Sequence, residues 1–206
     1  MKLASCNLKR CVGEVVSSGA ERVCKAHLTD PTRCFKVSRK EHSKETRREI
    51  KYFEHLERKG ITSPFFPSYF GFYETGEEFI IEQEFIGDRP EQQLFAFRLE
   101  EFLGEASDEQ LTEIFSLLRS LKAELINKNI IISDLHPGNI MLFRSGEKHI
   151  SRLIVVDGFG IPEAIPLAGW FSFFGEKKIE RQWIKFRKTF RATWLRRRDD
   201  TPTICF

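Results

Sequence analysis

Short runs of alternating apolar and polar residues, separated by turn residues, fill the first part of the chain. Residues 12–16, 22–27 and 33–37 are such runs, and residues 29–32 (Thr-Asp-Pro-Thr) supply a turn before the last of them. Alternation bounded by Gly, Pro, Asp and Ser is typical of strands that are joined by tight connections. The pattern therefore predicts a small antiparallel meander within residues 8–40.

The spacing of apolar residues then changes from a strand period to a helix period. Residues 45–59 place apolar side chains along one helical stripe. Ile50, Phe53, His55 and Leu56 lie on or near that stripe. Residues 66–73 and 78–85 return to strand-like runs around a Thr-Gly-Glu turn. We therefore expect five strands and one helix in a first unit that ends near residue 88.

A break in composition at residues 86–90 (Ile-Gly-Asp-Arg-Pro) predicts a hinge before a second unit, residues 89–206. Ser107 is a good N-cap for a helix over residues 109–127. The apolar stripe of that helix is continuous and comprises Leu111, Ile114, Phe115, Leu118, Leu121 and Leu125. The pattern predicts an α+β protein with a reduced, mostly helical second unit.

A β-hairpin is predicted next, with strands at residues 140–143 and 153–156. Asp134 and Asn139 precede its first strand, and Asp157 follows its second. A hairpin brings its two ends together, so these three side chains are expected to meet. Two carboxylates and an amide at one point are typical of a phosphoryl-transfer site, in which one acid handles the proton of the attacking hydroxyl and the other groups hold Mg²⁺.

Each half of this pattern also has an ordinary interpretation. Asp134 before a His-Pro-Gly-Asn turn is common turn chemistry, and Asp157-Gly158 is a common exit from a strand. The two halves joined by a hairpin favour the phosphoryl-transfer interpretation.

The first unit contains candidate nucleotide-binding residues. Lys36 alternates with apolar neighbours on a predicted strand, and Glu49 lies on the following helix, where it can pair with the lysine and fix its ammonium on the nucleotide. Gly19, in the turn between the first two runs, is a candidate for close approach to phosphates. Backbone groups from Glu84 to Ile86 are candidates for contact with an adenine. A plain hairpin turn and a solvent-facing lysine are the alternatives for Gly19 and Lys36.

Charge is unevenly distributed along the chain. The formal net charge is +3, but residues 177–198 hold ten Lys or Arg and one Glu, a net of +9 that leaves −6 for the rest. Helical spacing there aligns Ile179, Trp183, Phe186, Phe190 and Trp194 opposite the basic face. This predicts a terminal helix that docks on the body, with contact to a membrane surface as the alternative. A nucleic-acid partner is not favoured. Five cysteines without a C-x-x-C pair favour reduced thiols in the cytoplasm.

The chain resembles the bacterial YrbL family, the PhoP-regulatory-network proteins, within the protein-kinase-like superfamily. The resemblance runs over roughly residues 10–195 and is carried by residues 33–37, 45–56, 134–140 and 165–170. The Asp-Leu-His-Pro-Gly-Asn string at 134–139 is also similar to aminoglycoside- and choline-kinase-type phosphotransferases. The resemblance implies a bilobal kinase-like fold that uses ATP and Mg²⁺.

By that resemblance, Lys36 and Glu49 are the nucleotide-anchoring pair, Asp134 the catalytic base, and Asn139 and Asp157 the metal ligands. The family pattern is incomplete here, because Ile132 replaces the histidine of His-x-Asp and no Ala-Pro-Glu motif follows Gly160. Two functions stay open. One is a phosphotransferase that acts on a small molecule or glycolipid; the other is a nucleotide-binding pseudokinase with a regulatory role in a PhoP-type stress response.

Overall fold

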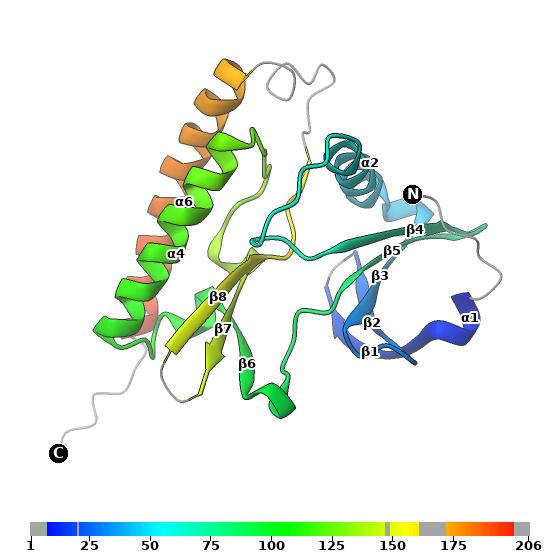
Figure 1. The fold of residues 1–206 in the computed structure, drawn as a ribbon, viewed down its shortest axis with the longest axis horizontal. Coiled ribbons are helices and arrows are strands. Elements are labelled where there is room, and N and C mark those ends of the chain that lie inside the picture. The colour runs from blue at the N-terminus through cyan, green and yellow to red at the C-terminus, as the bar shows by residue number, and fades with distance from the viewer. Residues whose placement is uncertain (1–7, 20, 147–148, 161–171, 200–206) are drawn as a thin grey trace. The chain divides into compact units, whose positions relative to one another are not determined.

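The chain forms two compact units in the computed structural model, which describes residues 8–19, 21–146, 149–160 and 172–199 (Figure 1). The first unit comprises Met1–Thr62 and Pro67–Phe85, and the second comprises Ser63–Phe66 and Ile86–Phe206. Each unit has its own antiparallel sheet and its own helices. The α+β fold class predicted from the sequence is confirmed.

A five-stranded antiparallel sheet and a long helix make up most of the first unit. The strands are β1 (Val12–Ser18), β2 (Val23–His27), β3 (Arg33–Arg39), β4 (Tyr69–Glu74) and β5 (Glu78–Glu84), in the spatial order β1-β2-β3-β5-β4. Helix α2 (Lys44–Arg58) connects β3 to β4, and the short elements α1 (Leu8–Cys11) and η2 (Lys40–His42) complete the unit. The predicted strands and helix are all present, with small shifts at their ends.

The two faces of this sheet are apolar and carry different neighbours. On one face, Phe79 and Ile81 pack against Ile50 of α2. On the other, Phe35 and Ile80 pack in a cluster that includes Leu8 of α1. Adjacent residues of a strand point to opposite faces, which is why consecutive residues of β5 belong to different clusters.

The second unit combines a three-stranded sheet with a helical pair. Its elements are η3 (Pro90–Gln92), β6 (Leu94–Arg98), α3 (Leu99–Phe102), α4 (Asp108–Asn127), η4 (Pro137–Asn139), β7 (Ile140–Ser145), β8 (His149–Val155) and α6 (Ser172–Asp199). The strands lie in the order β6-β7-β8 and are antiparallel. The predicted hairpin is β7–β8, whereas β6 and α3 were not predicted. The segment at 165–170 lies outside the described residues.

Helix α4 begins where the sequence predicts. The Ser107 hydroxyl accepts a hydrogen bond from the Gln110 N–H at 3.2 Å, and the Gln110 side chain accepts one from the Ser107 N–H at 3.0 Å. This reciprocal pair satisfies two N–H groups that the first turn leaves unbonded. Five members of its apolar stripe are buried, but the sixth, Phe115, is 45% exposed.

Helix α6 packs against α4, which confirms that the basic terminal helix docks on the rest of the unit (Figure 1). Its buried residues include Ile179, Trp183, Phe186 and Phe190. Trp183 and Phe186 are in ring contact with a centroid distance of 5.1 Å. None of the described helices is long and apolar enough to span a membrane.

Candidate functional site

A buried glutamate is paired with two cations in the first unit. Glu49 on α2 is 1% exposed, and its Oε1 accepts a hydrogen bond from Nζ of Lys36 on β3 at 3.1 Å. Its Oε2 pairs with the guanidinium of Arg22, the residue just before β2. The structure therefore brings Lys36 and Glu49 together, as their positions on strand and helix predict, and adds Arg22 as a second cation.

Strand pairing explains why Lys36 reaches α2. Lys36 lies opposite Ile81 of β5, and Ile81 packs against Ile50 of α2. Residues directly opposite each other on neighbouring strands share a face of the sheet, so Lys36 projects from the face that α2 covers. Glu49 precedes Ile50 on the buried side of that helix and meets the lysine there.

Two cations compensate the buried carboxylate of Glu49. A carboxylate taken out of water costs several kcal/mol unless it is paired, and Arg22 and Lys36 each contact one of its oxygens. Glu45 also lies 3.8 Å from the Arg22 guanidinium, but it is 54% exposed and also contacts Arg48. The charges of Arg22 and Glu49 thus fix the position of the Lys36 ammonium on this face of the sheet.

The charge of Lys36 also acts on a neighbouring thiol. Cys24 on β2 lies opposite Lys36 in the β2–β3 register. A hydrogen bond from Cys34 lowers the pKa of the Cys24 thiol, and the positive charge of Lys36 lowers it further. Lys36 thus contributes to the lowered pKa of this neighbouring thiol.

Gly19 lies in the turn between β1 and β2. Its N–H donates to the carbonyl of Arg22 at 2.8 Å, so the turn and the charged cluster share a residue. A Cβ placed on Gly19 would lie 3.6 Å from that carbonyl oxygen, which is an ordinary contact. The turn by itself therefore does not require glycine at this position.

The residues expected to contact an adenine lie at the end of β5. The Glu84 N–H donates to the Ser68 carbonyl at 2.8 Å, and the Glu84 carboxylate accepts from the Ser68 N–H at 3.2 Å. The Phe85 N–H donates to the Thr32 carbonyl at 2.8 Å. Ile86 is half-buried and begins the second unit. Contact of this segment with an adenine stays a prediction.

In the second unit, the loop that carries Asp134 is fastened to the segment after β8. The Ser133 N–H and hydroxyl donate to the Gly158 carbonyl at 2.8 and 2.9 Å, and the Asp134 N–H donates to the same oxygen at 3.3 Å. Ile132 and Phe159 form an antiparallel bridge between the same two segments, and both are buried. Ser133 and the main chain thus brace the loop in place of the missing histidine.

Asn139 and Asp157 join the same arrangement at the adjacent ends of the β7–β8 hairpin. The Asn139 amide nitrogen donates to the Asp134 carbonyl at 3.0 Å, and the Val156 N–H donates to the Asn139 carbonyl at 2.9 Å. Asp157 Oδ1 accepts from the Gly158 N–H at 2.6 Å. Asn139 is therefore bonded directly to Asp134, and Asp157 is connected to both through its neighbours Val156 and Gly158.

Gly158 permits this close approach. Its φ is +85°, and a Cβ at this position would lie 2.4 Å from the Asp134 carbonyl oxygen. Only glycine satisfies both the left-handed backbone and the contact.

His136 adds a proton donor beside Asp134. Its Nδ1 accepts from the Gly138 N–H at 3.1 Å, so the proton of the neutral ring is on Nε2. That nitrogen is 3.7 Å from Asp134 Oδ2, and the Asp134 side chain is 63% exposed. The carboxylate is thus largely open to a ligand.

A family model described as PhoP regulatory network protein YrbL matches residues 12–191. The chain belongs to the YrbL family. The YrbL proteins of Escherichia coli (strain K12) and of Shigella flexneri are each 32% identical to it over 179 residues, which is 83% of this chain and 82% of theirs.

Among solved structures, the chain is similar to a crystal structure of Rad53 1–466 in complex with AMP-PNP. The identity is 21% and the TM-score is 0.49, and the match covers 73% of this chain and 39% of that one. The kinase-like character of this YrbL-family protein is visible in its own first unit. There a five-stranded antiparallel sheet, one long helix and a lysine–glutamate ion pair occur together.

The oxygen donors of the second unit of this YrbL-family chain suit Mg²⁺. This cation prefers hard oxygen ligands and is usually held by one or two carboxylates together with substrate phosphates. Asp157 supplies a carboxylate, and the bond from the Asn139 nitrogen to the Asp134 carbonyl sets the direction of its amide oxygen. Across the described residues, no three His, Cys, Asp or Glu side chains lie close enough to hold a metal by themselves. One carboxylate and one amide oxygen are donors of the kind that hold Mg²⁺ together with substrate phosphates.

Two residues of this arrangement are not apparent from the sequence pattern. The pattern marks Arg22 only as the first residue of a strand, and its side chain reaches Glu49 because the chain enters β2 beside α2. It marks Ser133 only as a neighbour of a missing histidine. The serine hydroxyl next to Asp134 could have indicated this role, since serine side chains readily form hydrogen bonds to nearby main-chain groups.

Proposed function

We propose that this YrbL-family protein is an ATP- and Mg²⁺-dependent phosphotransferase of the cytoplasm that acts on a hydroxyl of a small molecule or glycolipid. The main support is that hydrogen bonds connect the segments that carry Asp134, Asn139 and Asp157 in the second unit. A protein that served only as a scaffold would need none of these side chains in this arrangement.

In the proposed reaction, the acceptor oxygen forms a bond to the terminal phosphorus of ATP as the bond to ADP breaks. The acceptor proton passes to Asp134, whose carboxylate is exposed beside the Nε2–H of His136. Asn139 and Asp157 would hold Mg²⁺, which offsets the charge that develops on the phosphate oxygens when it is bound. The products are a phosphate ester and ADP, with the proton released afterwards.

The first unit supplies the proposed nucleotide contacts. Lys36 would bind phosphate oxygens, with Glu49 and Arg22 fixing the position of its ammonium. The turn at Gly19 would lie over the phosphates, and Glu84 to Ile86 would contact the adenine. The Lys36–Glu49 ion pair supports this assignment, because it holds an ammonium in a fixed position and triphosphate is a strongly anionic ligand.

The alternative is a nucleotide-binding pseudokinase with a regulatory role in a PhoP-type stress response. The absence of an Ala-Pro-Glu motif after Gly160 favours it. The bracing of the Asp134 loop by Ser133 counts against it, because the loop keeps an ordered support without the histidine.

Two substitutions distinguish these functions without knowledge of the acceptor. Calorimetry should show that Asp157→Asn loses the Mg²⁺-dependent part of ATP affinity. Asp134→Asn should still bind ATP with Mg²⁺ but lose turnover, measured as slow ATP hydrolysis, by about two to four orders of magnitude. Glu109→Gln, which removes an exposed carboxylate at the start of α4, is the matched control and should change neither quantity.

Each outcome has a distinct meaning. If the wild-type protein shows no Mg²⁺-dependent ATP binding, the enzyme proposal is wrong. If it binds ATP but Asp134→Asn leaves hydrolysis unchanged, the protein is a nucleotide-dependent regulator and Asp134 is not its base.

A further inference from the structure

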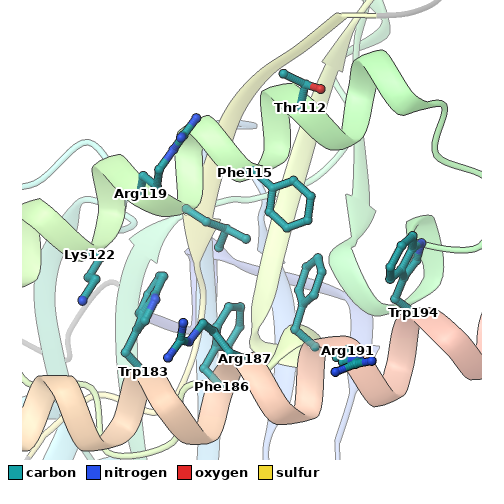
Figure 2. A pocket seen from close by; sticks show the side chains of 11 residues that line it. Thr112, Phe115, Arg119, Lys122, Trp183, Phe186, Arg187, Arg191 and Trp194 are labelled. Atoms are coloured by element: carbon teal, nitrogen blue, oxygen red, sulfur yellow. The ribbon is translucent and has the colours of Figure 1, made fainter.

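A groove runs between α4 and α6 in the second unit, and it has a volume of about 780 Å³ (Figure 2). Aromatic and aliphatic side chains from both helices form its apolar part. They are Phe115 and Leu118 of α4, and Trp183, Phe186, Phe190 and Trp194 of α6. Its volume is within the range of about 300–1,000 Å³ that is usual for small-molecule sites.

The groove is open to solvent beside Phe115, which α6 covers only in part. The other apolar residues of the α4 stripe are buried, but Phe115 is 45% exposed, although its ring centroid lies 5.6 Å from that of Phe190. Phe186 and Phe190 form the buried floor beneath, at 1% and 6% exposure. Binding of an apolar ligand would remove this apolar surface from water, which is a favourable change in free energy.

The rim of the groove is basic. Arg119, Lys122, Arg187 and Arg191 line it, and no lining residue is acidic. Lys122 is paired with Glu180 at 2.6 Å. Within the part of the chain that the structure describes, no acidic side chain pairs with Arg119, Arg187 or Arg191.

The apolar floor and the unpaired arginines together indicate a ligand that has both an apolar part and an anionic group. A guanidinium binds phosphate or carboxylate oxygens through paired hydrogen bonds, and aromatic rings accept an alkyl chain. We propose that the groove between α4 and α6 binds a single-chain anionic amphiphile, with its alkyl chain on the aromatic floor and its phosphate or carboxylate head group at Arg187 and Arg191. This site uses none of the residues assigned to phosphoryl transfer.

Dodecyl phosphate, kept below the concentration at which it forms micelles, is the probe. Trp183 and Trp194 line the groove, so a Trp170→Phe background restricts tryptophan fluorescence to the two rings that report binding. Calorimetry measures affinity in parallel. Dodecyl phosphate should bind saturably, and dodecyltrimethylammonium and inorganic phosphate, which lack the anionic head and the chain respectively, should each bind at least about tenfold more weakly.

Variants locate the site. Arg187→Glu combined with Arg191→Glu should reduce affinity by about tenfold or more, because head-group bonds become repulsion. Lys185→Glu combined with Lys188→Glu makes the same charge change at exposed positions of α6 that do not line the groove, and should have little effect. Phe115→Ala, at an exposed position, should weaken binding of the dodecyl chain and leave the thermal midpoint nearly unchanged.

Several results would overturn the proposal. Equal loss of affinity in the two double variants would indicate general attraction to a basic helix. Binding of anionic vesicles with no binding of monomeric dodecyl phosphate would indicate a membrane surface instead. Sedimentation that shows a dimer abolished by Phe115→Ala would assign the groove to a second copy of the chain.

Discussion

The two groups of candidate residues are held in place by different means. In the first unit, Lys36, Glu49 and Arg22 are positioned by ion pairs between side chains. In the second, Asp134 and Asp157 are positioned by hydrogen bonds that run mainly through the main chain. Residues positioned by ion pairs should be displaced when one of the charges is removed. Residues positioned by main-chain hydrogen bonds should be displaced when a glycine in the closely packed main chain gains a side chain.

The largest effect is expected at Gly158. Gly158→Ala would place a Cβ 2.4 Å from the Asp134 carbonyl oxygen at a φ of +85°, so the two segments must separate. We expect a loss of about 3 kcal/mol or more in the free energy of unfolding, measured by urea denaturation, together with loss of turnover.

Gly146→Ala is the control for Gly158→Ala. Gly146 has a φ of +62°, but no described atom lies within 4 Å of the position that a Cβ would take there. It should therefore show only the cost of the left-handed backbone, about 1 kcal/mol. Equal costs at both glycines would mean that the close approach to Asp134 contributes nothing.

Removal of the buried charge should have the next largest effect. Glu49→Gln leaves Lys36 and Arg22 side by side without this carboxylate, and they are only 12% and 16% exposed. We expect a loss of about 2 kcal/mol, reduced from the fully buried case because water reaches both cations. Glu45→Gln on the same helix, at a 54% exposed position, should cost less than about 0.5 kcal/mol. Similar losses in the two variants would show that the first unit is not held by this charge.

A smaller effect is expected from the hydroxyl that braces the Asp134 loop. Ser133→Ala removes the 2.9 Å bond to Gly158 but keeps both main-chain bonds to the same oxygen. A loss of about 1 kcal/mol should follow, with a larger relative fall in turnover than in ATP affinity. Ser120→Ala, where an exposed hydroxyl bonds back to Ser116 within α4, should be neutral or slightly stabilising. If Ser133→Ala changed neither stability nor turnover, the main-chain hydrogen bonds alone would support the Asp134 loop.

The smallest effect on stability is expected at Gly19. A Cβ fits there at 3.6 Å from the Arg22 carbonyl oxygen, so Gly19→Ala should change the free energy of unfolding by less than about 0.5 kcal/mol. It should nevertheless raise the Kd for ATP with Mg²⁺ in calorimetry, because a methyl group would stand where a phosphate is proposed to approach. Gly76→Ala, in another open turn, should change neither quantity. Equal ATP affinity in both variants would remove Gly19 from the nucleotide site.

The sequence predicted what depends on local pattern. The α4 helix with its Ser107 cap follows from period and capping chemistry, and the Lys36–Glu49 pair follows from a strand lysine before a helix glutamate. Strand β6 was missed because its apolar run, Leu94–Arg98, becomes a strand only through pairing with β7. The exposure of Phe115 was missed because periodicity identifies the apolar face of a helix, but it does not show how much of that face the neighbouring helix covers.

The crowding of donors at the Gly158 carbonyl affects the rate at which nearby amide hydrogens exchange with solvent. A carbonyl oxygen has two lone pairs, yet three donors approach this one, and the Asp134 N–H is the most distant at 3.3 Å. The Asp134 amide should therefore exchange its hydrogen with solvent before the Ser133 amide does. We therefore expect the loop to adjust to an incoming acceptor first at Asp134, while Ser133 stays bonded to Gly158.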